Sequence, residues 1–135
     1  MINILVVDDE VLLQELLSER LVAELGATVM TASSGNEAIE LIQMGNKFDL
    51  IVSDSSMPDG TGTDLLRYVT RQEVPALFIF FTGSMTLEIP PPNDLFLGIV
   101  EKSDKNMLFE KISYGIEIVW RRRSEQDLML NEAST

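Results

Sequence analysis

The feature that most constrains the fold is a series of five short apolar runs that alternate with segments of helical periodicity. The first run, residues 2–7, is apolar except for Asn3 and is followed by acids, as expected for a strand buried on both faces of a sheet. The later runs span residues 28–32, 48–53, 76–81 and 96–100. Strands that alternate with helices predict a parallel sheet covered on both faces, with right-handed crossovers.

The segments between the runs predict where helices begin and end. Residues 11–25 carry leucines at helical spacing, and Gly26 provides a natural stop. Residues 34–37, Ser-Gly-Asn-Glu, have the form of a capping box before the next helix. Ser103 or Asp104 can cap a last helix, which follows the fifth run.

These elements predict an α/β fold with a five-stranded parallel sheet, doubly wound, in the flavodoxin-like order 2-1-3-4-5. Pro90, Pro91 and Pro92 lie between the fourth and fifth runs and cannot all sit inside a helix. The fourth helix should therefore be short, displaced or absent. We expect one domain over residues 1–121 and, over residues 122–135, a helix extension, a disordered tail or a linker stub.

The composition excludes several kinds of chemistry. The 135 residues include no cysteine and no histidine, which excludes disulfides, thiol chemistry and imidazole bases or ligands. A formal net charge of -12 disfavours phosphate backbones, so no direct nucleic-acid binding is expected. No apolar run approaches the roughly 20 residues that a membrane span needs. The start lacks the features of a signal peptide, and we expect a cytoplasmic location with no membrane partner.

Polar residues that follow the strands predict a site. In an open parallel sheet, ligands gather outside the carboxyl ends of the strands, where the strand order reverses. The residues placed there are Asp8, Asp9, Asp54, Thr82 and Lys102. Three crowded carboxylates repel one another, and a hard divalent cation such as Mg²⁺ relieves that repulsion. A metal, an ammonium and oriented donors around a nucleophile are the equipment of phosphoryl transfer, with Asp54 as the candidate nucleophile.

Each of these residues alone has an ordinary structural explanation. Lys102 alone would be a surface lysine, Thr82 a strand-end hydroxyl and Asp54 a turn cap. For Glu10 we favour such an explanation, because an acid there suits the positive N-terminus of the first helix. The indication of a site comes from four strand ends that supply compatible groups to one place.

Four motifs carry a resemblance to a known family. They are LVVDDE at 5–10, DLIVSDSSMPDGTG at 49–62, FFTGS at 80–84 and VEKS at 100–103. In this order they resemble the receiver domain of two-component response regulators, over residues 2–121. The resemblance implies a switch that accepts a phosphoryl group from a histidine kinase or phosphotransfer protein. It also implies dependence on Mg²⁺, with Mn²⁺ as an alternative. No enzyme activity is implied beyond self-catalysed phosphotransfer and autodephosphorylation.

The resemblance further implies a role for each residue. Asp54 matches the phosphoacceptor, Asp9 the direct metal ligand, and Asp8 the acid that acts through a metal-bound water. The backbone carbonyl of Ser56 matches the remaining protein ligand of the metal.

The same resemblance names the groups that hold the phosphoryl oxygens. Thr82 matches the hydroxyl that moves toward the phosphoryl group, and Lys102 matches the lysine that pairs with it. Backbone N–H groups of Ser55 and Gly83 are expected to hold its oxygens.

The chain departs from the family on the face through which receivers signal or dimerise. Ile99 occupies the position of a switch aromatic, and Phe96 is expected to lie on the same strand but out of phase. Ser103 stands where most members have a proline. A homodimer through the region around the last helix is a further expectation.

Two alternatives stay open. The first is a receiver-like interaction module with atypical or lost switching, which the aliphatic Ile99 favours. The second is a Mg²⁺-dependent phosphohydrolase. Such enzymes often carry a second aspartate two residues after the nucleophile, where this chain has Ser56. A dinucleotide enzyme is disfavoured because residues 8–10 are acidic where a glycine-rich loop would be needed.

Overall fold

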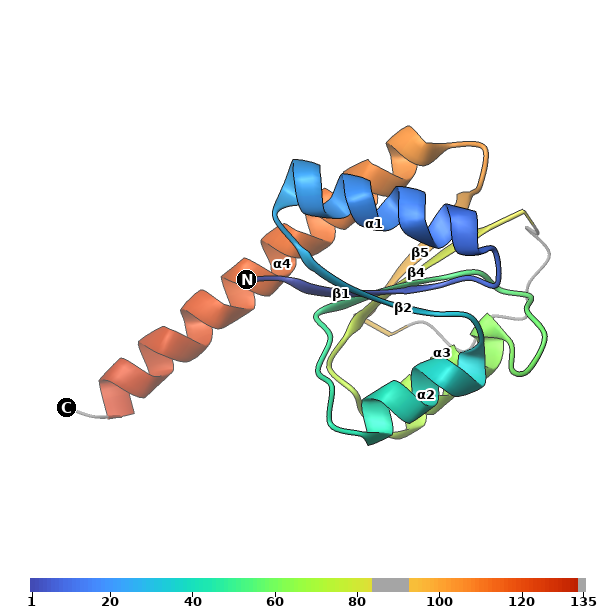
Figure 1. Cartoon of the computed structure of the whole chain (residues 1–135). Helices are drawn as coiled ribbons and strands as arrows, with labels where there is room; N and C mark the ends of the chain where they lie inside the picture. The colour runs from blue at the N-terminus through green and yellow to red at the C-terminus, as the bar shows by residue number, and fades with distance from the viewer. Residues whose placement is uncertain (84–92, 134–135) are drawn as a thin grey trace.

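The computed structural model describes residues 1–83 and 93–133 (Figure 1). It is a five-stranded parallel sheet in the order β2-β1-β3-β4-β5 with helices on both faces, as predicted. The elements in chain order are β1 (Asn3–Val7), α1 (Val11–Leu25), β2 (Thr28–Ala32), α2 (Gly35–Gln43), β3 (Leu50–Ser53), α3 (Gly62–Arg71), β4 (Leu77–Thr82), β5 (Phe96–Glu101) and α4 (Lys105–Ala133).

Helices α1 and α4 cover one face of the sheet, and α2 and α3 cover the other (Figure 1). Alternation of side chains along the strands creates the two cores. On β1, Ile4 and Val6 pack in the core under α1 and α4, whereas Leu5 and Val7 pack under α2 and α3. Strands β3 and β4 are buried along their whole length, which explains why they read as continuous apolar runs.

The capping motif predicted before α2 forms in part. The Ser34 hydroxyl accepts a hydrogen bond from the N–H of Glu37 at 3.0 Å. The Glu37 carboxylate accepts from the N–H of Ser33 at 3.1 Å instead of from Ser34. A full capping box, which the sequence analysis did not single out, forms at α3 between Thr61 and Asp64.

The ends of α1 and α4 follow the predicted cues. Gly26 ends α1 in the left-handed conformation, with φ of 64°. Of the two candidate caps for the last helix, Asp104 is the one used, since its Oδ1 accepts from the N–H of Met107 at 3.0 Å. Helix α4 then continues to Ala133 and projects past the sheet (Figure 1), so it crosses the predicted boundary at residue 121 without a break. The division of the chain at that residue stays a prediction.

Strand β5 differs from the prediction in its phase. Strand β4 pairs with Phe96 and then with Gly98, so Leu97 is an extra residue that forms a bulge. Gly98 has φ of 126°, a conformation that favours glycine. Phe96 and Ile99 therefore both pack in the core under α2 and α3, while Leu97 packs in the other core. The prediction that Phe96 is out of phase with Ile99 is wrong, because the bulge adds a residue between them.

Other boundaries differ by one or two residues. Strand β3 begins at Leu50 and not at Phe48. Directly before β3, the side-chain carboxylate of Asp49 accepts a hydrogen bond from the N–H of Asn3 at 2.8 Å. A side chain therefore takes the place of a main-chain carbonyl in the pairing of β1 with β3 at this point. The prediction of a short, displaced or absent fourth helix falls on residues 84–92, which lie outside the described residues. Within the described ranges, no helix combines the length and apolar character needed to cross a membrane.

Candidate functional site

The carboxyl ends of four strands bring the predicted side chains to one edge of the sheet. Asp8 and Asp9 follow β1, Asp54 follows β3, Thr82 ends β4 and Lys102 follows β5. The three aspartates each offer a carboxylate oxygen, and these oxygens all lie within 4.8 Å of one another. Asp8 and Asp54 are buried, whereas Asp9 is exposed to solvent. The edge thus combines two buried anions with a third that solvent can reach.

Lys102 links two of these carboxylates. Its Nζ lies 2.9 Å from Oδ2 of Asp8 and 2.9 Å from Oδ2 of Asp54. Burial alone would lower the pKa of Lys102, but the hydrogen bonds to Asp8 and Asp54 outweigh it and raise the pKa above its usual range. The ammonium is therefore charged at neutral pH.

Asp8 is the most constrained of the acids. Its Oδ1 accepts the N–H of Glu10 at 2.9 Å, and its own N–H donates to the Ala32 carbonyl at 3.0 Å. Burial nevertheless raises the pKa of the Asp8 carboxyl above its usual range, although the bonds from Glu10 and Lys102 act in the opposite direction. The ionised form of Asp8 is under-stabilised, and a further cation would favour it.

Glu10 lies closer to the site than the sequence analysis expected. It occupies the N-cap position of α1, but its side chain makes no capping hydrogen bond. Its Oε1 instead lies 3.6 Å from Nζ of Lys102. The sequence offered a cue for this contact, since Glu10 continues the acidic run after β1.

Asp54, Ser55 and Thr82 form a chain of polar contacts. The Ser55 N–H, predicted to hold a phosphoryl oxygen, donates to Oδ1 of Asp54 at 2.7 Å. The Ser55 hydroxyl lies 2.7 Å from the Thr82 hydroxyl. The role of the Ser55 side chain was missed, although a hydroxyl directly after the candidate nucleophile was a usable cue. Both hydroxyls are buried beside Asp54, where they can orient polar atoms.

The remaining predicted groups flank this centre. Ser56 is exposed in the loop after Asp54, and Gly83 is exposed directly after β4. Among the described residues, a Cβ atom added at Gly83 would meet no other atom within 4 Å.

The loop between β3 and α3 approaches the backbone of Asp54 closely. The Gly62 N–H donates to the Ser55 carbonyl at 3.0 Å. A Cβ atom at Gly62 would collide with the Asp54 carbonyl oxygen, so only glycine fits there. Gly60 has φ of 99°, which also favours glycine. The glycines of this motif therefore serve the tight return of the loop beneath Asp54.

The donor set fits a magnesium ion. The described groups are carboxylate oxygens, which are the hard ligands that Mg²⁺ prefers. The three clustered carboxylates carry two more negative charges than the ammonium of Lys102 neutralises (3 - 1 = 2), and Glu10, 3.6 Å from Nζ of Lys102, adds a further one. A divalent cation would offset most of this excess. Asp8, Asp9 and Asp54 are the residues that would hold it.

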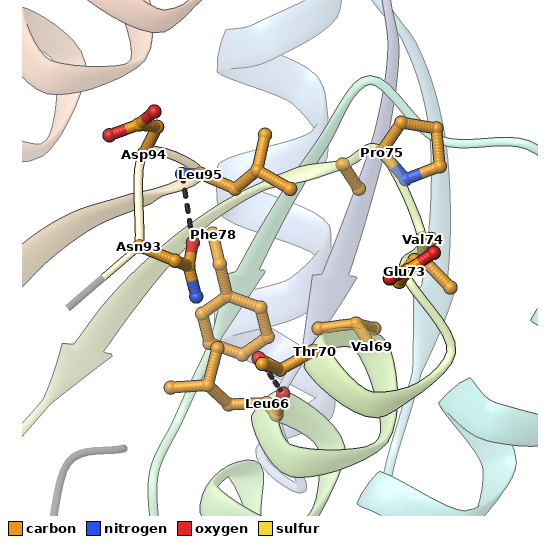
Figure 2. Close-up of a pocket in the computed structure, with 11 residues that line it drawn as sticks. Leu66, Val69, Thr70, Glu73, Val74, Pro75, Phe78, Asn93, Asp94 and Leu95 are labelled. Carbon is orange, nitrogen blue, oxygen red and sulfur yellow. Dashed lines mark hydrogen bonds between the residues drawn. The ribbon is translucent and has the colours of Figure 1, made fainter. Parts of the chain in front are cut away.

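A separate cavity of about 350 Å³ lies at the opposite end of the strands (Figure 2). Apolar side chains of α3 and β4 line it, among them Leu66, Val69 and Phe78. At its rim, Asn93 accepts the N–H of Leu95 through its side chain at 2.8 Å. Asn93 directly follows residues outside the described ranges, and we assign the cavity no ligand.

The chain belongs to the response regulator receiver domain family. The family pattern described as "Response regulator receiver domain" matches residues 4–89, more than half of the chain. Lys102 lies beyond that match, and its place in the site comes from the geometry described above.

Similar proteins agree with this assignment. Response regulator SaeR of Staphylococcus aureus is 35% identical over 83 residues, which cover 62% of this chain and 35% of SaeR. The match thus spans about a third of the length of such curated relatives. The crystal structure of TrrA from Thermotoga maritima, in complex with Mg²⁺-BeF, shares 32% identity with a TM-score of 0.74 and covers 85% of this chain and 99% of TrrA. The non-phosphorylated HemR receiver domain of Leptospira biflexa shares 26% identity with a TM-score of 0.70, covering 86% and 94% of the two chains.

Proposed function

We propose that this chain is a phosphorylatable receiver domain that accepts a phosphoryl group on Asp54 and relays the signal by a change of conformation. The observation that carries the proposal is the placement of the Asp54 carboxylate. Its Oδ2 lies 2.9 Å from Nζ of Lys102, and an oxygen of the same carboxylate belongs to the three-acid cluster. A nucleophile that contacts both a cation and a metal-binding cluster suits phosphoryl transfer.

In the proposed reaction, a carboxylate oxygen of Asp54 attacks the phosphorus of a phosphohistidine on a sensor kinase or phosphotransfer protein. An O–P bond forms, the N–P bond breaks, and the imidazole leaves. A bound Mg²⁺ would neutralise charge on the phosphoryl oxygens. Lys102 would transfer its contact from Oδ2 of Asp54 to the phosphoryl group, because the new group carries more charge and more acceptor oxygens.

The groups around Asp54 would hold the product. The Ser55 N–H donates to the Asp54 carboxylate and can donate to a phosphoryl oxygen instead. Thr82 would turn its hydroxyl from Ser55 toward the phosphoryl group, and the Gly83 N–H would supply a further donor. The backbone carbonyl of Ser56 would complete the protein ligands of the metal. Attack of water on the phosphorus would break its bond to Asp54, release inorganic phosphate and return the Asp54 carboxylate to its free state.

The switch would act through β5, at the position of Ile99. In this chain Ile99 is aliphatic, but Phe96 packs in the same core and its ring contacts that of Phe80 with centroids 5.9 Å apart. Movement of Thr82 at the end of β4 would thus reach an aromatic cluster through the β4–β5 ladder. We place the domain in a cytoplasmic two-component phosphorelay, without nucleic-acid contact of its own, and with a homodimer through the region around α4.

Measurement of intact mass tests this proposal. Incubation with acetyl phosphate and Mg²⁺ should add one phosphoryl group to the wild-type chain, and EDTA should prevent the addition. The Asp54→Asn variant should show no adduct. Asp59→Asn is a matched control, because Asp59 is exposed in the same loop and contacts Asn36 on α2. An adduct that persists in Asp54→Asn, or none in the wild type, would refute the assignment.

The second candidate is an interaction module that binds partners without switching. The observation that favours it is Ile99, which has no ring to reorient. Spectra of backbone amides with Mg²⁺ and beryllofluoride separate the two functions. Changes confined to the site would favour the module, whereas changes that extend to Phe96 and Ile99 on β5 would favour the switch.

A further inference from the structure

The side chain of Gln14 is buried directly behind the acidic edge, and no part of the proposed reaction uses it. Gln14 lies in the second turn of α1 and is only 6% exposed. A buried amide needs hydrogen-bond partners, because an unpaired polar group in a core is costly. The hydrogen-bond partners of the Gln14 side chain all lie in segments that precede or flank the site.

Three acceptors surround the amide nitrogen of Gln14. Nε2 donates to the main-chain carbonyl of Asp8, and it lies 3.1 Å from the Ala32 carbonyl and 3.1 Å from the Ser33 hydroxyl. These acceptors belong to the end of β1 and to the end of β2 with the residue after it. Gln14 thus joins α1, β1 and β2 at one point.

The Asp8 carbonyl belongs to the peptide that joins Asp8 to Asp9. A peptide group is planar, so a bond to its oxygen also fixes the direction of the Asp9 N–H and limits where the Asp9 side chain can point. Asp9 is exposed, and among residues 1–83 and 93–133 no hydrogen bond or ion pair holds its side chain. The Asp8 carboxylate is held by Glu10 and Lys102, so the plane of this peptide is the constraint that acts on the position of Asp9 relative to it.

We propose that Gln14 is a positioning residue for the metal site: it orients the peptide between Asp8 and Asp9 so that both carboxylates face the ion. This inference rests on the proposed function, because it concerns the same Mg²⁺ site. Residues that orient metal ligands without touching the metal typically change metal affinity by 10- to 100-fold when replaced. Gln14 meets that description through the backbone and not through a ligand side chain.

Calorimetric titration with Mg²⁺ tests the proposal on three proteins: wild type, Gln14→Met and Ser18→Ala. Methionine keeps the length of the side chain but supplies no donor. Ser18 lies one turn further along α1, and its buried Oγ has no hydrogen-bond partner within residues 1–83 and 93–133. We expect Gln14→Met to raise the dissociation constant for Mg²⁺ about tenfold or more, and Ser18→Ala to leave it within about twofold of wild type.

Unfolding by urea in EDTA accompanies the titration, because a merely structural role would lower stability without a selective loss of Mg²⁺ affinity. If Gln14→Met does not fold, a titration of the wild type with Mg²⁺ tests the proposal instead. The chemical shifts of the Gln14 side-chain amide protons should then change with the same midpoint concentration as those of Asp9. An unchanged dissociation constant in folded Gln14→Met, or amide protons that do not respond, would overturn the proposal. A wild type that binds Mg²⁺ but gains no phosphoryl group would refute the proposed function alone.

Discussion

Two ion clusters hold opposite edges of the sheet, and they differ in charge balance. At the amino edge, Nη2 of Arg123 lies 2.9 Å and 3.0 Å from the two carboxylate oxygens of Asp49. The same guanidinium donates to the Met1 carbonyl at 3.0 Å. One cation meets one anion, and the partners of both come from the chain itself.

At the carboxyl edge, one ammonium serves several acids. Lys102 contacts Asp8 and Asp54 at the same distance of 2.9 Å, and Asp9 adds a third carboxylate to the cluster. The acids are held together by the fold although they repel one another. Such an arrangement stores electrostatic energy that a cationic ligand can release, and perturbed groups of this kind concentrate at functional sites.

Charge balance and position in the sheet distinguish a structural ion pair from a functional one in this fold. The Arg123–Asp49 pair is neutral overall and links α4 to the start of β3. It has no excess charge that a bound ion would neutralise. The cluster around Lys102 is incomplete in charge and lies where strand order reverses. Variants at the two edges should therefore respond differently to Mg²⁺.

Loss of the shared cation should have the largest effect. We expect Lys102→Met to lower the free energy of unfolding in EDTA by about 2 kcal/mol, less than for a fully buried pair because Lys102 is partly exposed. Mg²⁺ should recover part of this loss and stabilise the variant more than it stabilises the wild type. Urea unfolding with and without Mg²⁺ measures both effects. An equal loss of free energy of unfolding with and without Mg²⁺ would contradict the excess of negative charge in this cluster.

Loss of one anion from the balanced pair should have an intermediate effect. We expect Asp49→Asn to lower the free energy of unfolding by about 1 kcal/mol, because the charge-assisted bonds from Arg123 weaken. Since Asp49 lies at the edge opposite the metal cluster, Mg²⁺ should not change this value. The same urea titration checks it, and any recovery by Mg²⁺ would show that the two edges are not independent.

Loss of one anion from the crowded cluster should have the smallest effect. Because burial raises the pKa of Asp8, its ionised form is disfavoured in the folded state. Asp8→Asn should therefore change the free energy of unfolding in EDTA at pH 7 by less than about 0.5 kcal/mol.

The difference in free energy of unfolding between the wild type and Asp8→Asn should depend on pH, and the raised pKa of Asp8 fixes the direction of that dependence. A raised folded-state pKa means that the folded chain binds the Asp8 proton more tightly than the unfolded chain. The wild type should therefore gain stability relative to Asp8→Asn as the pH falls from neutral through the raised pKa toward the unfolded value near 3.8. Urea unfolding at a series of pH values without Mg²⁺ measures the difference. A relative loss upon acidification would contradict the assigned direction.

Much of the sheet could be predicted because parallel strands that are buried on both faces consist mostly of consecutive apolar residues. Strands β1, β3 and β4 are apolar except at one end, and their positions fix which polar residues follow or end them. From these positions the meeting of Asp8, Asp54 and Thr82 at one edge of the sheet follows from the strand order. The phase of β5 could not be predicted, because a bulge at Leu97 depends on how β5 pairs with β4 and on the backbone freedom of Gly98.

The finer contacts of the site also lay beyond the sequence. The bond from Gln14 to the Asp8 carbonyl depends on how α1 packs against the ends of β1 and β2. In a helical pattern, Gln14 looks like any polar surface residue. The contact of Glu10 with Lys102 depends on the entry angle of the same helix. Such contacts arise from the arrangement of whole elements and not from residue spacing.

Dependence of stability on Mg²⁺, compared between wild type and Asp9→Asn, tests the central claim that the unbalanced acids form a metal site. Asp9 is exposed, so asparagine there should leave the fold intact. At a Mg²⁺ concentration ten times the dissociation constant, the wild type should gain about 1.4 kcal/mol in free energy of unfolding. Asp9→Asn should gain less than about half of that value. Equal gains in the two proteins, or no gain in the wild type, would contradict the account.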